Sequence, residues 1–223
     1  MTKTLLITGA SSGIGAATAR AAAEAGWNVA LCARSADKLE AIAGEIGDAA
    51  LAIPCDVTKR EAIADALSLA AGKFGQIDGV FANAGTGVEA AGVENGDPEA
   101  WHDMIHVNIL AVLYTAHAAI PYLKKTKGHF IVTGSKAGRD NMKGSVYSAT
   151  KWFVHGFGEN LAEEMREWGG RATVIAPGMV DTAFFDEPKP GKIQAEDVAN
   201  AVIFALSQPE TAAVREIYIM PND

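Results

Sequence analysis

The 223-residue chain has little cysteine and few aromatic residues, with two cysteines, Cys32 and Cys55, and 7% Phe, Trp and Tyr. Two cysteines exclude the disulfide framework of a small secreted domain, and we expect buried free thiols. Basic residues are also in deficit, because 19 Lys and Arg stand against 27 Asp and Glu, for a formal net charge of −8. This balance argues against a general nucleic-acid or anionic-membrane surface, although it allows a local basic pocket.

Long apolar runs are absent as well, so we expect no membrane span, and the N-terminal residues do not form a signal-peptide pattern. The expectation is therefore a cytoplasmic protein that binds neither nucleic acid nor membrane. Hydrophobic residues make up 49% of the chain and charged residues 21%, which is ordinary for a globular protein. A chain of this length can bury one sizeable core, and we expect one domain over residues 1–223.

Short apolar, β-prone runs alternate with helical segments along the chain. Strands are expected at residues 4–8, 27–32, 50–54, 77–82, 129–133, 172–176 and 216–219. Helices are expected at about residues 16–25, 35–47, from a capping box at 58–61, 97–123, 146–168 and 195–206. Strands that are continuously apolar rather than alternating are typical of a parallel sheet covered on both faces. The sequence predicts an α/β fold, a doubly wound Rossmann sheet of seven parallel strands.

A glycine-rich turn follows the first strand. Its candidate ligand-binding residues are Gly9, Ser11, Ser12, Gly13, Ile14 and Gly15. A strand that leads through such a turn into a helix forms an anion site, because backbone N–H groups converge there and the helix dipole favours a phosphate. The glycines permit a tight turn and close approach of the backbone to a ligand. Their spacing, Gly-x-x-x-Gly-x-Gly, differs from the common G-x-G-x-x-G fingerprint.

Tyr147 and Lys151 are four residues apart and share one face of a predicted helix. We expect the lysine ammonium to stabilise the phenolate and to lower the pKa of Tyr147 from its ordinary value of about 10. Tyr147 would then donate a proton to a carbonyl oxygen, or accept one in the reverse direction. Ser135 lies twelve positions upstream, after an apolar run, where its hydroxyl can hold the same oxygen.

Six motifs occur in an order typical of one family. They are Thr8-Gly9-x-x-x-Gly13-Ile14-Gly15, Asn83-Ala84-Gly85, Asn108, Ser135, Tyr147-x-x-x-Lys151 and Pro177-Gly178. With this set, over about residues 4–219, the chain resembles the short-chain dehydrogenase/reductase family. The resemblance implies an oxidoreductase that moves a hydride between a nicotinamide and a small carbonyl or alcohol substrate, with reduction the preferred direction. The alternative is a non-catalytic dinucleotide sensor or scaffold on the same fold, which loss of Tyr147 or Lys151 would have favoured.

The resemblance also implies the roles of four catalytic residues. Tyr147 resembles the family's acid/base, and Ser135 the residue that orients the substrate oxygen. Lys151 would hold the nicotinamide ribose hydroxyls and depress the pKa of the tyrosine. Asn108 matches a helical asparagine that holds a water behind the lysine, and its structural alternative is a core amide with satisfied hydrogen bonds.

Two features depart from the family pattern. The spacing from Ser135 to Tyr147 is one residue shorter than expected, and Ser145 and Ser148 are weaker stand-ins if Ser135 does not reach the site. Residues 183–194 form a short, proline-bearing segment where relatives often have a longer lid. We expect a more open pocket, or one completed by a neighbouring subunit, with Val88 and Phe184 among its lining residues.

The end of the second strand indicates which cofactor is bound. A dinucleotide without a 2′-phosphate usually meets an acidic residue there, whereas this chain reads Cys32-Ala33-Arg34-Ser35. Arg34 and Ser11 could clamp a 2′-phosphate by charge-assisted hydrogen bonds, so we expect NADP rather than NAD; the structural alternative is an exposed arginine at a helix start. By resemblance, Asp56 and Val57 would contact the adenine, Asn83, Ala84 and Gly85 the adenosine side, and Pro177, Gly178, Val180 and Thr182 the nicotinamide.

No metal site is expected. His102, His106 and His117 lie near helical spacing but lack carboxylate or cysteine companions. The two long helices expected at 97–123 and 146–168 are rich in alanine and apolar residues, and the resemblance implies a homodimer or homotetramer formed through them. The fold does not identify the substrate, since one fold supports many chemistries.

Overall fold

The computed structural model describes residues 1–87 and 92–222. The strands are β1 Thr4–Thr8, β2 Asn28–Ala33, β3 Ala50–Pro54, β4 Gly79–Ala82, β5 His129–Thr133, β6 Arg171–Pro177 and β7 Glu216–Ile219. The α-helices are α1 Gly13–Glu24, α2 Ala36–Ile46, α3 Arg60–Phe74, α4 Pro98–Ile105, α5 Ala111–Thr126, α6 Val146–Arg166 and α7 Ala195–Ser207. A π-helical turn, His106–Leu110, joins α4 to α5, and a 3₁₀ turn, Lys136–Gly138, follows β5.

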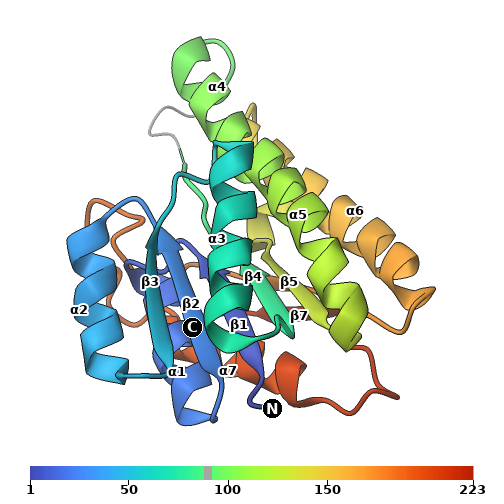
Figure 1. Cartoon of the computed structure of the whole chain (residues 1–223). Helices are drawn as coiled ribbons and strands as arrows, with labels where there is room; N and C mark the ends of the chain where they lie inside the picture. Colours follow the sequence, from blue (N-terminus) through green and yellow to red (C-terminus); the bar gives the residue numbers. More distant parts are fainter. Residues whose placement is uncertain (88–91, 223) are drawn as a thin grey trace.

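The seven strands form one parallel sheet in the order β3-β2-β1-β4-β5-β6-β7. Helices α3, α5 and α6 cover one face, and α1, α2 and α7 the other (Figure 1). Successive residues of β1 serve the two faces, because Leu6 packs in one buried cluster while Leu5 and Ile7 pack in the other. The predicted Rossmann fold is confirmed, and burial on both faces explains why its strands are continuously apolar.

The capping prediction is correct at the start of α4 and wrong at the start of α3. Asp97 caps α4, since its Oδ1 accepts a hydrogen bond from the Glu99 N–H at 3.0 Å. The capping box expected at Thr58 is absent, because α3 begins at Arg60 with no side-chain cap. The Thr58 N–H and hydroxyl instead donate to Asp56 Oδ1, at 3.0 and 2.8 Å. These hydrogen bonds to Asp56 hold Thr58 in the turn after β3, so Thr58 does not cap α3.

The long helix expected from residue 97 is continuous from Pro98 to Thr126, but it is irregular at its π-helical turn. By length and composition it could cross a membrane, contrary to the expectation that no segment would. Val112, Ala116 and Ala119 on this helix are buried in the cluster above the sheet. Packing on the sheet therefore accounts for its apolar character.

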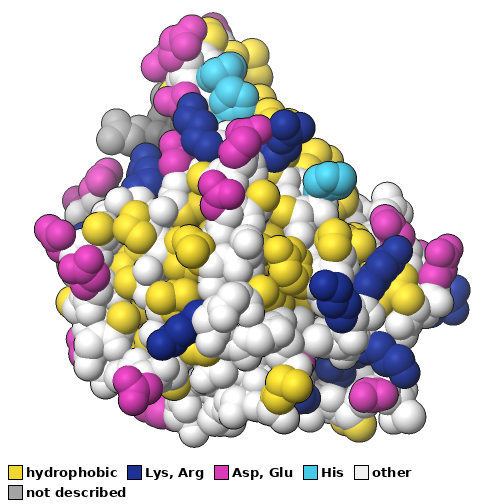
Figure 2. Space-filling model, in the orientation of Figure 1, with side chains coloured by type: hydrophobic (Ala, Val, Ile, Leu, Met, Phe, Trp, Pro, Cys, Tyr) yellow, Lys and Arg dark blue, Asp and Glu magenta, His cyan; other side chains and the backbone are white. Residues whose placement is uncertain are grey.

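The two cysteines are free and buried, Cys32 in β2 and Cys55 directly after β3, as expected. Burial raises the pKa of the Cys32 thiol well above its usual range, and the pKa of Cys55 to about 11. Both are uncharged at neutral pH and are packed as small apolar side chains. On the surface, acidic and basic side chains are interspersed over the face that carries α3 and α5 (Figure 2).

Candidate active site

The residues singled out in the sequence follow the carboxyl ends of neighbouring parallel strands, and therefore share one edge of the sheet. The strand order reverses between β1 and β4, and this switch point is where doubly wound sheets bind ligands. The glycine turn follows β1, Arg34 follows β2, and Asp56 and Val57 follow β3. Beyond the switch point lie residues 83–85 after β4, Ser135 after β5 and residues 178–182 after β6.

The turn after β1 is built for glycine. Gly9 and Gly13 have φ values of +67° and +50°, in the left-handed region that favours glycine. A Cβ on Gly15 would lie 2.3 Å from the Gly9 carbonyl oxygen, so no side chain fits there. Ser12 precedes α1 without a side-chain cap, which leaves the N–H groups of the first turn free of capping. Thr182 borders this turn, since its Cγ2 lies 3.3 Å from a Cβ built on Gly13.

Asn83 joins three strand ends. Its Nδ2 donates to the carbonyls of Thr8 and Gly9 at 3.1 and 3.4 Å. Its Oδ1 accepts from the Thr133 hydroxyl at 3.1 Å. Thr8 Oγ1 in turn accepts from the N–H groups of Asn83 and Ala84. The Asn83 amide is thus engaged within the protein, where it holds the crevice in shape, and its contact with an adenosine stays a prediction.

Tyr147 and Lys151 lie on α6, with Lys151 Nζ 5.8 Å from the centre of the Tyr147 ring. Lys151 is only 5% exposed, and its ammonium donates to the Thr133 carbonyl at 2.9 Å. Burial lowers the pKa of Lys151 to about 8. Burial raises the pKa of Tyr147, and a hydrogen bond with Ser135 lowers it by less. The expected lowering of the tyrosine pKa is therefore wrong for the protein alone, because loss of solvation outweighs the opposing contact.

Ser135 lies near Tyr147 despite the short spacing, since it acts on the pKa of the tyrosine. Its Oγ also accepts from the Ala137 N–H at 3.1 Å. The two stand-in serines have other partners: Ser145 Oγ caps α6 by accepting from the Ser148 N–H, and the Ser148 hydroxyl donates to the Ala137 carbonyl. They hold the start of α6 against the serine turn, and so Ser135 is the hydroxyl that faces Tyr147.

Asn108 lies in the π-helical turn, is 1% exposed and has a fully engaged amide. Its Oδ1 accepts from the Thr86 N–H at 2.9 Å, and its Nδ2 donates to the Thr86 carbonyl at 2.9 Å and to Thr150 Oγ1 at 3.1 Å. A Cβ on Gly85 would lie 3.5 Å from Asn108 Oδ1 and 3.7 Å from Lys151 Nζ. The amide thus joins the segment after β4 to α6 beside the lysine, and its role in holding a water stays a prediction.

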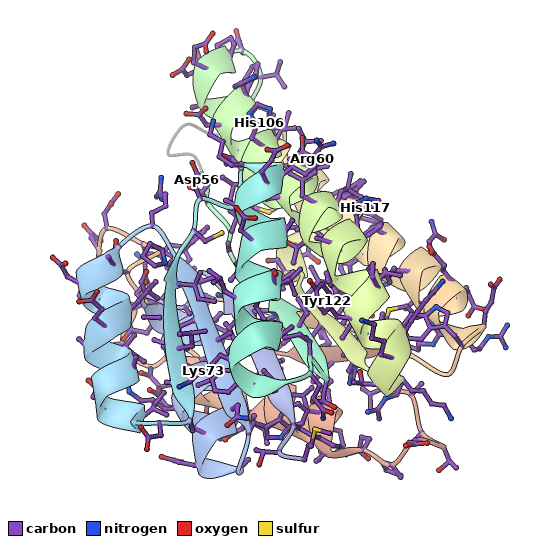
Figure 3. All side chains as sticks on the ribbon, in the orientation of Figure 1. Asp56, Arg60, Lys73, His106, His117 and Tyr122 are labelled. Carbon is purple, nitrogen blue, oxygen red and sulfur yellow. The ribbon has the colours of Figure 1, made fainter. Side chains whose placement is uncertain are left out.

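Arg34 is exposed at the end of β2 and makes no hydrogen bond or ion pair with the described part of the chain. Its charge contributes to lowering the pKa of Asp56, which lies between β3 and α3 (Figure 3). Burial raises the pKa of Asp56, but hydrogen bonds from Thr58 and the charges of Lys59 and Arg34 lower it overall. Arg34 is therefore a cation near the crevice that has no hydrogen-bond or ion-pair partner within residues 1–87 and 92–222.

The short segment after β6 covers Tyr147. A bridge between Val180 and Ile193 closes its base. The Phe184 ring centre lies 5.9 Å from that of Tyr147, and its Cζ lies 3.0 Å from a Cβ built on Gly87. Phe184 remains 46% exposed. The trimmed lid therefore still places an aromatic ring over the tyrosine. Val88, the other expected lining residue named above, lies outside the described residues.

Two of the three histidines on the long helix lie together, since the ring centres of His102 and His106 are 4.2 Å apart. His106 and His117 are well separated along the outer side of that helix (Figure 3). Over residues 1–87 and 92–222, the side chains include no group of three His, Cys, Asp or Glu residues that could hold a metal ion. Lys136, beside the serine, forms an ion pair with Asp140 one helical turn further on.

Comparison with known proteins agrees with this arrangement. Residues 3–192 match the short chain dehydrogenase family. An uncharacterized oxidoreductase of Staphylococcus aureus (strain MRSA252) is 39% identical, with 98% of this chain and 97% of the relative covered. An alcohol dehydrogenase from the archaeon Thermococcus sibiricus, solved with 5-hydroxy-NADP, superposes with a TM-score of 0.92 at 34% identity, covering 100% of this chain and 97% of that one.

A third likeness extends the range of chemistry on this fold. A 3-ketoacyl-(acyl-carrier-protein) reductase from Brucella melitensis, solved with NADH, has a TM-score of 0.88 at 28% identity and covers 97% of this chain and 96% of its own. The family match covers residues 3–192, and the likenesses in sequence and in fold run over nearly the whole chain. The chain belongs to the short-chain dehydrogenase family and is an oxidoreductase of that family.

Proposed function

We propose that the protein is an NADP-dependent oxidoreductase that reduces a carbonyl group to an alcohol, with Tyr147 as the acid. The observation that carries this proposal is that Tyr147 lies beside the buried ammonium of Lys151, with Ser135 close enough to lower the pKa of the tyrosine. A substrate oxygen placed against both hydroxyls would meet one group that orients it and one that donates a proton. The Thermococcus sibiricus relative, an alcohol dehydrogenase solved with 5-hydroxy-NADP, supports the same reading.

The glycine turn and Arg34 fit an NADP molecule. No Cβ fits at Gly15, and α1 starts without a side-chain cap, so a pyrophosphate can approach the N–H groups of the helix start. Arg34 has no partner among the described residues and can pair with a 2′-phosphate. A bound NADPH would supply the hydride, which is chemistry that no side chain provides.

The protonation states suit reduction. Burial raises the pKa of Tyr147, so the side chain is a neutral phenol at pH 7 and can give up its proton. Donation leaves a phenolate next to Lys151, whose pKa of about 8 leaves most of the lysine charged at pH 7. The ammonium would then stabilise the developing anion in a buried site, where the interaction is screened less than it is in bulk water. Ser135 would hold the substrate oxygen together with Tyr147 throughout the reaction.

Replacement of Tyr147 by phenylalanine tests this assignment. We expect turnover with NADPH to fall by roughly 10²-fold or more, which is the usual loss when a general acid is removed. NADPH affinity, measured by fluorescence titration, should change by only a few fold. Tyr122→Phe is the matched control, because Tyr122 lies near the end of α5 (Figure 3), half-buried against the core cluster, and its hydroxyl makes no hydrogen bond with the described residues; it should keep full turnover.

The assay uses a mixed panel of aldehydes, ketones and keto acids with NADPH and with NADH. Undiminished turnover in Tyr147→Phe would rule out the tyrosine as the acid. Wild-type protein that binds NADPH tightly but reduces no member of the panel would favour a dinucleotide sensor instead. We also propose a cytoplasmic homodimer or homotetramer formed through the continuous helix Pro98–Thr126 and α6, since Ile105 and Trp152 are exposed on these two helices; sedimentation analysis tests the oligomeric state.

A further inference from the structure

A buried histidine lies directly behind the serine of the site. His155 is one helical turn beyond Lys151 on α6 and is 7% exposed. Its Nε2 lies 3.0 Å from the Ser135 carbonyl oxygen and 3.4 Å from the Ser135 N–H nitrogen. Its Nδ1 lies 3.1 Å from Glu216 Oε1, at the start of β7. The imidazole therefore bridges the serine backbone and a carboxylate from another strand.

Two glycines make room for this ring on either side of Ser135. A Cβ on Gly134 would lie 2.8 Å from His155 Nε2, and a Cβ on Gly138 would lie 2.5 Å from His155 Cδ2. A side chain at either position would displace the imidazole or the serine turn. The sequence around Ser135 is thus shaped to accept the histidine against its backbone.

Arg139 closes the network from the other end of the serine turn. Its Nε donates to Glu216 Oε1 at 3.2 Å, and its guanidinium forms an ion pair with the same carboxylate. Glu216 therefore joins His155 to Arg139, the residue that ends the 3₁₀ turn after Ser135. The serine turn is held at its first residue by the imidazole and at its last by the arginine.

Four groups face His155 and act on its pKa. They are Glu216 from β7, Arg139 from the serine turn, Lys151 from its own helix and the Ser135 backbone. Burial lowers the pKa of His155, the Ser135 carbonyl and Glu216 raise it, and Arg139 and Lys151 lower it, with a lowered value as the net result. When the neutral ring has its proton on Nδ1, on the side of the Glu216 carboxylate, its Nε2 accepts from the Ser135 N–H. When Nε2 becomes protonated, it no longer accepts from the Ser135 N–H and instead donates to the Ser135 carbonyl.

We infer that His155 is a positioning residue: it holds the backbone of Ser135 so that the serine hydroxyl faces Tyr147, while Glu216 and Arg139 orient the imidazole. His155 has no role in contacting the substrate, and its kinetic effect rests on the function proposed above. Its loss should leave the tyrosine, the lysine and the cofactor crevice in place. The expected signature is therefore a lower kcat with little change in the KM for NADPH.

The test compares two substitutions. His155→Phe fills the volume and removes both polar contacts, and we expect kcat to fall by about tenfold or more, the rate equivalent of one hydrogen bond of ordinary strength. His155→Gln keeps a polar group near Ser135 and should retain more of the wild-type kcat. As the pH is lowered, the wild-type kcat should fall, with an inflection at a pH below the ordinary histidine pKa of about 6.5. Both variants should lack that inflection.

His129→Phe is the matched control. His129 is also buried, with Nε2 2.7 Å from Thr173 Oγ1, and it lies at the first residue of β5, the strand end opposite Ser135. It should lower the thermal midpoint while the kcat of the folded protein stays unchanged. Full kcat with a wild-type pH profile in folded His155→Phe would overturn the inference.

A second measurement needs no turnover, and so separates this inference from the proposed function. In ¹⁵N-labelled protein, the Ser135 amide resonance should titrate with His155 in the wild type and lose that titration in His155→Gln. Wild-type protein that shows this titration but reduces no carbonyl would retain the positioning contact and reject the proposed function. A Ser135 amide that does not respond to pH would overturn the contact itself.

Discussion

Replacement of Asn108 by alanine would cut three hydrogen bonds at one point in the site. The amide bonds to the Thr86 N–H and carbonyl, at 2.9 Å each, and to Thr150 Oγ1 at 3.1 Å. Its side chain is almost completely buried. The substitution removes the link between the segment after β4 and α6, and it leaves the polar groups of Thr86 without their partner.

The loss of stability follows from these contacts. Three hydrogen bonds of ordinary net strength, about 0.5–1.5 kcal/mol each, correspond to a loss of about 2–4 kcal/mol in the free energy of unfolding. The N–H and carbonyl of Thr86 lose their hydrogen-bond partner, which keeps the value near the upper end. For a protein of this size 1 kcal/mol corresponds to about 2–4 °C, so a loss of about 3 kcal/mol lowers the thermal midpoint by about 6–12 °C. Because Lys151 lies beside the same amide, we also expect reduced turnover at temperatures where the variant is folded.

Thermal unfolding followed by circular dichroism measures the change. Asn160→Ala is the control, because Asn160 is exposed on α6 and alanine there favours the helix. Its midpoint should equal or slightly exceed that of the wild type. A drop of less than about 2 °C in Asn108→Ala would mean that the loss is below 1 kcal/mol, and would refute the view that this amide joins the two segments.

Two further substitutions test the charges of the site. Arg34→Asp should weaken NADPH binding by about 10–100-fold, the value of a charge-assisted contact, and leave NADH nearly unchanged; an unaltered NADPH/NADH ratio in fluorescence titrations would remove Arg34 from the site. Burial holds the pKa of Lys151 at about 8, below its unfolded value of about 10.4, so the free energy of unfolding should rise from pH 8 to pH 10 by up to about 3 kcal/mol. Lys151→Met should lack this rise in urea titrations and be inactive; an unchanged pH slope would show that the lysine is not desolvated.

The sequence was sufficient for features that depend on local pattern. Continuous apolar runs predicted the strands, and the glycine spacing predicted the turn after β1. Once the sheet is parallel, its topology requires that residues following successive strands share one edge. That is why Arg34, Asp56 and Ser135, which are far apart in the chain, lie along the same edge of the sheet.

Features that depend on tertiary packing were not predictable. The pKa of Tyr147 is decided by how deeply its hydroxyl is buried, and a helical spacing contains no information on depth. The π-helical turn at Asn108 has no local sequence signal, and forms where the amide meets Thr86 and Thr150. Thr133 and His155 were missed for the same reason, although the polar character of His155 within an apolar helix face was a weak signal. Thr8 was named in the glycine-turn motif, but its hydrogen bonds to the segment after β4 were not predicted.

The same physical cause acts on both ionisable groups of the site, and under the proposed function it decides which protonation state each group brings to the reaction. Burial disfavours charge, so it raises the pKa of Tyr147 and lowers that of Lys151. A tyrosine held as phenol is ready to donate a proton, as carbonyl reduction requires, whereas alcohol oxidation requires the phenolate. Because the lysine retains most of its charge at pH 7, it would stabilise the phenolate that donation produces without forming it beforehand. Under the proposed function, this balance suits reduction near neutral pH and suits oxidation better as the pH rises.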